Sequence, residues 1–428
     1  MKAVGRIINR LLTLSSSKTA LNTYIVFTGN ILAMFFAFFY VVILVRLLSL
    51  ADFGYFSTIF TFLVVVTELS DMGIGNSLSR FIPPLKGKNM ELFSFLKTAF
   101  LLQVGIVVFV LLLVILSSDF LSLLFFHDIE YSYLFKITAV SVVASIMTNF
   151  FMYVLSARQK FLHTGVITTL NGLLRLALLL VLVMISKVNL TNIIWILAFT
   201  FLILMLISFF LVGPEFLKGK YSNKKMKNLI CFSLYLGAAR GFTSVATRLD
   251  VLMLVTLTNA VEVGIYSIAS RVIALYPLLS GSFTTVIAPR IAVMQNIKQF
   301  KTYIYKVISA TVGLVFSILL LIFFSSPFLS ILFGEKGDLA VPVFIWLLTA
   351  MIFFVASIPA VAVAIYYVKK PHILTINGLL QLLIVFGGNF ILIPKYGKFG
   401  AAYSLNLAYC VTLLLTSFMS IYYLKKQK

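Results

Sequence analysis

The chain has 428 residues, of which 61% are hydrophobic and only 11% are charged, and its mean hydropathy is +1.11. Soluble domains carry roughly 25% charged residues, so this composition excludes a soluble protein and predicts an all-α polytopic membrane protein. The net charge of +22 lies mostly in short loops and not in a soluble basic domain. This excludes a nucleic-acid partner and favours contact with anionic membrane lipids.

The first 20 residues alternate basic and apolar side chains and lack the small-residue cleavage site of a signal peptide. Such a pattern predicts an amphipathic helix, residues 1–20, that lies on the membrane surface and remains in the mature chain.

Twelve apolar segments follow, each long enough to cross a bilayer as a helix. They run approximately over residues 22–45, 54–78, 95–117, 133–156, 164–186, 190–212, 229–256, 261–286, 304–326, 340–367, 372–394 and 400–424. Two further apolar pieces, Phe120–Phe126 and Phe328–Phe333, are too short to cross. We expect them to rest at the membrane interface.

The distribution of lysine and arginine predicts the orientation of these segments. Basic clusters such as Lys218–Lys227 and Lys425–Lys428 alternate along the chain with connections that hold Asp119, Asp128 and Glu130. Basic loops face the cytoplasm, so both termini are expected to be cytoplasmic.

An internal repeat divides the chain into two halves. The segment Asp52–Ser57 recurs as Glu262–Ser267, the apolar piece Phe120–Phe125 as Phe328–Phe333, and TLNGLLRL, Thr169–Leu176, as TINGLLQL, Thr375–Leu382. Arg80 also matches Arg290 at the end of the corresponding span. The repeat predicts two six-helix bundles, residues 1–215 and 216–428.

Because six is an even number, the two bundles should have the same orientation and be related by a pseudo-two-fold axis along the membrane normal. Bundles related in this way enclose a central cleft that opens to either side when one bundle rocks against the other. This geometry of alternating access is typical of transport.

Four arginines lie inside the apolar segments: Arg175, Arg240, Arg248 and Arg271. An arginine at the centre of a spanning helix costs about 2.5–3.5 kcal/mol on insertion scales, so such residues are expected to line a polar interior. Guanidinium groups bind phosphate through paired, charge-assisted hydrogen bonds. The four residues therefore predict a central cationic cavity for an anionic substrate. Pairing with intramembrane carboxylates, or helix packing in the case of Arg175, is the alternative.

Three acids also lie within the spans: Glu68, Asp71 and Asp250. Glu68 and Asp71 are candidates to hydrogen-bond sugar hydroxyls, with a place at a helix interface as the alternative. Asp250 is either a salt-bridge partner or a Na⁺ or H⁺ site that couples transport to an ion gradient, with Asn377 as a second group of that site. The three histidines are too scattered for a metal site, and no cofactor is expected.

Several stretches together resemble a known family. Leu48–Tyr55, Leu69–Gly75 and Ser77–Phe81 are similar to segments of the polysaccharide flippases that move O-antigen and related repeat units. Phe328–Gly334 and Lys398–Ala402 add to this similarity. These flippases belong to the multidrug/oligosaccharidyl-lipid/polysaccharide exporter superfamily.

The resemblance implies a flippase, and not an enzyme, of the bacterial cytoplasmic (inner) membrane. It implies translocation of an undecaprenyl-diphosphate-linked oligosaccharide from the cytoplasmic to the outer leaflet for cell-surface polysaccharide biosynthesis. It also implies a polysaccharide polymerase as a partner.

The sequence is also compatible with two other functions. A multidrug or small-molecule exporter of the same superfamily should have an acidic or apolar cavity, which the excess of arginine disfavours. A membrane polysaccharide polymerase should carry a large external loop, whereas the connection Ser118–Ser132 is short. The sequence has no G-x-x-x-x-G-K phosphate loop, which excludes ATP-driven transport within this chain.

Overall fold

The computed structural model describes residues 18–292, 297–368, 370 and 372–426, and all regular secondary structure in them is helical. The predicted surface helix over residues 1–20 lies outside the described residues, except for its last three positions. Those three begin α2 (Lys18–Leu47).

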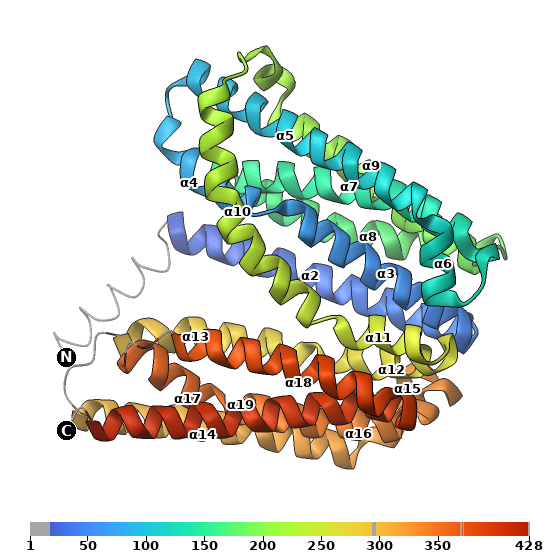
Figure 1. Cartoon of the computed structure of the whole chain (residues 1–428), viewed down its shortest axis with the longest axis vertical. Coiled ribbons are helices and arrows are strands. Elements are labelled where there is room, and N and C mark those ends of the chain that lie inside the picture. Colours follow the sequence, from blue (N-terminus) through green and yellow to red (C-terminus); the bar gives the residue numbers. More distant parts are fainter. Residues whose placement is uncertain (1–17, 293–296, 369, 371, 427–428) are drawn as a thin grey trace, which may run out of the picture. The chain divides into compact units, whose positions relative to one another are not determined.

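The helices follow the order of the two predicted repeats (Figure 1). In the first half, α2 is followed by α3 (Leu50–Asp71), α4 (Ile74–Phe81), η1 (Pro83–Leu85), α5 (Asn89–Leu116), α6 (Ser118–Phe126), η2 (Ile129–Tyr131), α7 (Ser132–Ala157), α8 (Phe161–Met184), α9 (Leu190–Val212) and η3 (Pro214–Lys218). The second half contains α10 (Asn223–Ala246), α11 (Leu249–Leu257), α12 (Ala260–Ile273), α13 (Leu275–Ala292), α14 (Ile297–Phe323), α15 (Ser325–Phe333), α16 (Glu335–Ala356), α17 (Ile358–Ala362), η4 (Val363–Tyr367), α18 (His372–Tyr396) and α19 (Lys398–Lys426).

Eleven helical segments in the described residues are long and apolar enough to cross a membrane. They correspond to every predicted span except the seventh, residues 229–256, which is divided between α10 and α11. The two short apolar pieces form the nine-residue helices α6 and α15. The all-helical, multi-span class is therefore confirmed.

Contacts divide the chain into two compact units. Unit 1 comprises residues 1–44 and 62–244, and unit 2 comprises residues 45–61 and 245–428. These units differ from the predicted halves because the first part of α3 packs in unit 2, and most of α10 packs in unit 1. The division of the repeats at residues 215 and 216 remains a prediction.

The core of unit 1 lies around α7, which contacts α4, α5, α8 and α9 (Figure 1). Its buried hydroxyls bond to carbonyls one turn earlier: Thr138 donates to the Leu134 oxygen and Thr148 to the Ala144 oxygen, both at 2.7 Å. Such back-bonding satisfies polar groups where no water reaches, as a spanning helix requires.

In unit 2, two glycines of the internal repeat pack against each other's helices. A methyl group at Gly54 on α3 would overlap the carbonyl oxygen of Ala260, and one at Gly264 on α12 would overlap that of Leu50. Only residues without a side chain allow α3 and α12 to approach this closely. The D-F-G and E-V-G segments of the repeat therefore meet at one helix crossing.

Two basic side chains fix the end of α2 within unit 2. Arg46 donates from Nε to the carbonyl oxygen of Leu332 at 2.9 Å, at the last turn of α15. Lys336 donates from Nζ to the carbonyl oxygens of Val45, at 2.9 Å, and of Arg46, at 3.2 Å. Each cation thus satisfies carbonyl groups that a helix end leaves without partners.

Candidate functional site

The structure places the four span arginines on three helices and at one helix break. Arg175 lies on α8 in unit 1, and Arg271 lies in the last turn of α12 in unit 2. Arg248 lies in unit 2 at the break between α10 and α11. Arg240 belongs to α10, but its side chain is outside the described part of the chain.

Arg175 and Arg271 each lie against a phenylalanine ring of a neighbouring helix. The Cζ atom of Arg175 is 5.0 Å from the centroid of Phe201 on α9, and that of Arg271 is 4.7 Å from the centroid of Phe60 on α3. A cation over an aromatic face is attracted by the ring quadrupole, which offsets part of the loss of hydration. The helix-packing contact considered for Arg175 is present, and a role in substrate binding remains a prediction.

Arg248 lies beside Asp250 where the seventh predicted span is interrupted. α10 ends at Ala246 and α11 begins at Leu249, with Arg248 as the residue that precedes the first turn of α11. Asp250 accepts a hydrogen bond from the Val251 amide at 2.8 Å and another from the Tyr266 hydroxyl on α12. A carboxylate in the first turn also interacts favourably with the helix dipole.

A stripe of polar side chains on α18 continues the environment of Asp250. Asn377 and Gln381 are four residues apart, which places them on one face of the helix, and Asn389, eight residues after Gln381, lies on the adjoining face. Gln381 hydrogen-bonds to Tyr409 on α19, a residue that also interacts electrostatically with Asp250. We refer to Asp250, Tyr266, Gln381 and Tyr409 as the Asp250 cluster.

Asn377 uses its amide nitrogen to donate to Thr416 on α19. It is 4% exposed, and its Oδ1 atom has no partner in the described residues; neither does either polar atom of the fully buried Asn389. A buried amide left unsatisfied costs about 1–3 kcal/mol, so this stripe is suited to a water molecule or a small cation. The two predicted coupling residues, Asp250 and Asn377, lie in the same unit. Asn377 is one turn of α18 away from Gln381, a member of the Asp250 cluster.

The two acids of α3 that were predicted to bind substrate, Glu68 and Asp71, have different surroundings. Glu68 is exposed. Asp71 lies where α3 ends, and its Oδ1 atom accepts a hydrogen bond from the Gly75 amide at 3.0 Å. Gly73, which lies between Asp71 and Gly75, has a φ of +77° and approaches the backbone of Gly237 on α10. Asp71 therefore caps α4, and its predicted contact with sugar remains a prediction.

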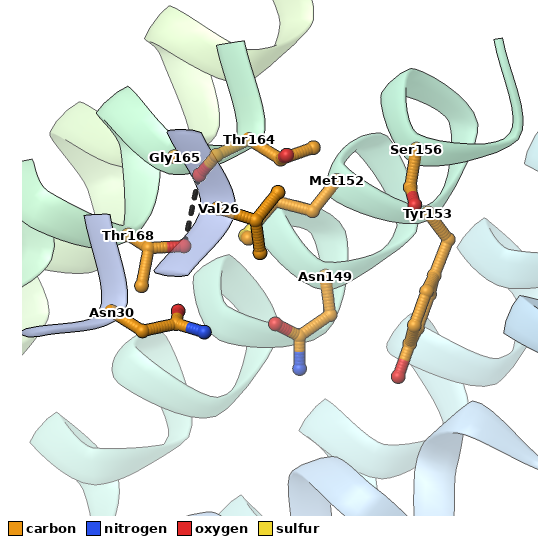
Figure 2. A pocket seen from close by; sticks show the side chains of 9 residues that line it. All are labelled: Val26, Asn30, Asn149, Met152, Tyr153, Ser156, Thr164, Gly165 and Thr168. Carbon is orange, nitrogen blue, oxygen red and sulfur yellow. Dashed lines mark hydrogen bonds between the residues drawn. The ribbon is translucent and has the colours of Figure 1, made fainter. Parts of the chain in front are cut away.

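Sequence reasoning missed one pocket in unit 1, of about 300 Å³, between α2, α7 and α8 (Figure 2). None of the predicted site residues lines it. Its polar lining consists of asparagine, threonine, serine and tyrosine side chains. The sequence signals for it are two asparagines within apolar spans, Asn30 and Asn149, and two threonines one helical turn apart, Thr164 and Thr168.

Comparisons with known proteins agree with this architecture. The family model described as polysaccharide biosynthesis protein matches residues 20–295. A comparison with curated proteins gives no match.

Among solved structures, the lipid II flippase MurJ in an inward closed conformation is similar, with a TM-score of 0.71, 19% identity, and coverage of 93% of this chain and 87% of that one. An inward-facing multidrug resistance MATE family transporter of the MOP superfamily has a TM-score of 0.72 and 12% identity, with coverage of 91% and 93%. An outward-facing transporter of that family has a TM-score of 0.64 and 13% identity, with coverage of 95% and 96%.

Transporters with this fold have twelve helices in two bundles, which confirms the predicted fold class. The structural likeness therefore extends over nearly the whole chain, and the sequence match covers more than half of it. The chain belongs to the family of polysaccharide biosynthesis proteins.

Proposed function

We propose that this protein is a flippase that moves an undecaprenyl-diphosphate-linked oligosaccharide from the cytoplasmic to the outer leaflet of a bacterial cytoplasmic membrane, by alternating access. Both termini face the cytoplasm in this proposal. The observation that carries it is the presence of Arg175, Arg248 and Arg271 within the spans of a polysaccharide biosynthesis protein. Together with Arg240 they supply the cationic cavity.

The chemistry of the head group supports this role. A diphosphate must leave water to cross the membrane, and positive charges that pair with it offset the free-energy cost of its lost hydration. Arginine keeps its proton at every physiological pH and offers a planar set of N–H donors that matches phosphate oxygens. No covalent bond of the substrate needs to change, so the protein acts as a transporter and an external polymerase uses the delivered repeat unit.

The membrane potential favours the proposed direction. Moving one negative charge outward through an inside-negative potential releases about 2.3 kcal/mol per 100 mV, and a diphosphate with two charges gains about twice that. Export can therefore proceed without ATP hydrolysis.

The test of the function is genetic and chemical. Deletion of the gene is expected to cause one lipid-linked glycan to accumulate on the cytoplasmic leaflet, where a membrane-impermeant glycosidase or lectin added to inverted vesicles reaches it. Restoring the wild-type gene should clear the accumulated lipid. Unchanged amounts and sidedness of every lipid-linked glycan in the deletion strain would contradict the proposal.

Coupling to a Na⁺ or H⁺ gradient is assigned to the Asp250 cluster together with Asn377. The carboxylate is held by Tyr266, and the unsatisfied Oδ1 atom of Asn377 adds a further oxygen to the same bundle. Carboxylate, amide and hydroxyl oxygens are suitable ligands for a hard cation. In this arrangement the gradient assists flipping and is not obligatory.

The substitution Asp250→Asn tests the coupling because it preserves shape while it removes the charge. Substrate binding should be retained, and flipping should continue under the potential alone. The ion gradient should no longer stimulate flipping. A typical coupling free energy corresponds to a stimulation of about 5- to 150-fold, which this variant should lose. The matched control is Asp119→Asn, an exposed acid beside Lys136. An Asp250→Asn protein that binds substrate but no longer flips it at all would refute this assignment.

A further inference from the structure

The pocket of unit 1 lies near the starts of α2 and α8 and the end of α7 (Figure 2). The charge distribution of the loops predicts that these three helix ends face the cytoplasm. Its polar lining comes from Asn30 on α2, from Asn149, Tyr153 and Ser156 on α7, and from Thr164 and Thr168 on α8. It is therefore located where a substrate from the cytoplasmic leaflet would enter.

The lining determines the chemical class of ligand. Every polar side chain is an uncharged amide or hydroxyl, and Val26 and Met152 add apolar surface. In Figure 2 the amides of Asn30 and Asn149 point into the same space. A carboxylate or an ammonium group buried here would lose its hydration without a charged partner, which is expensive. A neutral molecule with several hydroxyls fits this lining.

The volume of the pocket limits the size of its ligand. A volume of about 300 Å³ is at the small end of the range for ligand sites. This suits one monosaccharide rather than a drug-sized molecule.

A polar face of α8 leads from the pocket to a cation. Thr164, Thr168, Asn171 and Arg175 are spaced by four, three and four residues, which places them on one face of the helix. With a rise of 1.5 Å per residue, Thr168 and Arg175 are about 10 Å apart along the axis. The Oδ1 atom of Asn171, between them, is buried without a partner in the described residues.

Close packing keeps the pocket walls in place. A methyl group at Gly29 on α2 would lie 3.0 Å from the Gly165 Cα atom on α8, and Thr169 on α8 donates to the Gly29 carbonyl oxygen at 3.2 Å. These contacts fix α2 against α8, so the ligand does not have to organise the walls on binding.

We propose that this pocket binds the neutral sugar residue next to the diphosphate, with the diphosphate on the Arg175 side. This inference rests on the proposed function and deepens it, because it names the sugar class that the flippase accepts at its entrance. A uronic acid in that position is not stabilised by the pocket.

The test uses the full-length protein in lipid nanodiscs and three probes: undecaprenyl diphosphate, its glucose adduct and its glucuronic acid adduct. Two to three new hydrogen bonds should make the glucose adduct bind about 10-fold more tightly than the carrier alone. The glucuronic acid adduct should show no such gain.

Asn149→Leu keeps the size of the side chain and should abolish the gain for glucose without changing the affinity for the carrier. Thr168→Val, a milder variant, should reduce the gain. The matched control is Thr148→Val, because Thr148 neighbours Asn149 but faces α9, where it approaches the Phe201 carbonyl oxygen at 3.4 Å. That control should keep the full gain.

The outcomes separate the two proposals. Equal binding of carrier and glucose adduct by the wild-type protein, or a full glucose gain in both pocket variants, overturns the sugar pocket and leaves the flippase intact. Failure of all three probes to bind overturns the flippase and the pocket with it.

Discussion

Replacing Arg248 by alanine is expected to weaken the binding of undecaprenyl diphosphate roughly 10- to 150-fold, because a hydrogen bond to a charged group contributes about 1.5–3 kcal/mol. Arg248 lies at the break within the seventh predicted span, where it interacts electrostatically with Asp250. The loss should be seen as a right-shifted binding isotherm and as slower flipping in vesicles.

Two further variants sharpen this prediction. The affinity of Arg248→Lys for undecaprenyl diphosphate should lie between those of the wild type and Arg248→Ala, because lysine keeps the charge but lacks the planar pair of donors. Arg290→Ala removes an exposed arginine of the same unit and should bind normally. If Arg248→Ala and Arg240→Ala both bind and flip with normal kinetics, the idea of a cationic cavity fails.

The largest effect on folding is expected from Gly54→Ala. Its new methyl group would overlap the carbonyl oxygen of Ala260, and a backbone atom cannot rotate away as a side chain can. Overpacking in a well-packed interior costs about 1–3 kcal/mol and occasionally more. We therefore expect a midpoint of thermal unfolding in detergent that is several degrees lower, and little folded protein for Gly54→Leu.

The control for this substitution is Gly105→Ala on α5, where no neighbouring atom lies within 4 Å of the added methyl group. Because alanine is the better helix former by about 1 kcal/mol, this variant should be neutral or slightly stabilised. Equal melting temperatures for Gly54→Ala and Gly105→Ala would show that α3 and α12 do not cross as described.

Much of this fold could be predicted because a membrane span is defined by length and hydropathy alone. Among the described residues, every expected segment except the divided seventh corresponds to a candidate span, and the pieces too short to cross coincide with α6 and α15. The repeat also identified residues that lie close together in the structure. Its two glycines, Gly54 and Gly264, turned out to mark one helix crossing.

The helix breaks could not be predicted by a method that averages over about 20 residues. The interruption after Asp71 depends on two positive φ angles, +43° at Met72 and +77° at Gly73, and on a capping carboxylate. The break before Arg248 likewise falls inside an apolar run. The packing of residues 45–61 with the second unit depends on tertiary contacts, which a hydropathy pattern does not contain.

The sequence predicted only part of the candidate site. Charged side chains stand out in apolar segments, whereas uncharged polar side chains such as asparagine and tyrosine do not. The arginines and Asp250 were found for that reason. Tyr266 and Tyr409 were not distinguished from core aromatics, and Asn149 was not distinguished from a residue that bonds across helices. Gln381 could have been found, since it occupies the repeat position of Arg175.

In the proposed mechanism, the protein moves a lipid because of its phosphorylated head group. The most direct measurement compares flipping, in vesicles with a set potential, of undecaprenyl diphosphate glucose and of uncharged undecaprenyl glucoside. The diphosphate lipid should cross at a rate that rises with the outward driving force on its charge, and the glucoside should not cross above the rate of protein-free vesicles. Equal transport of both lipids, or no transport of the diphosphate at any potential, would contradict the account.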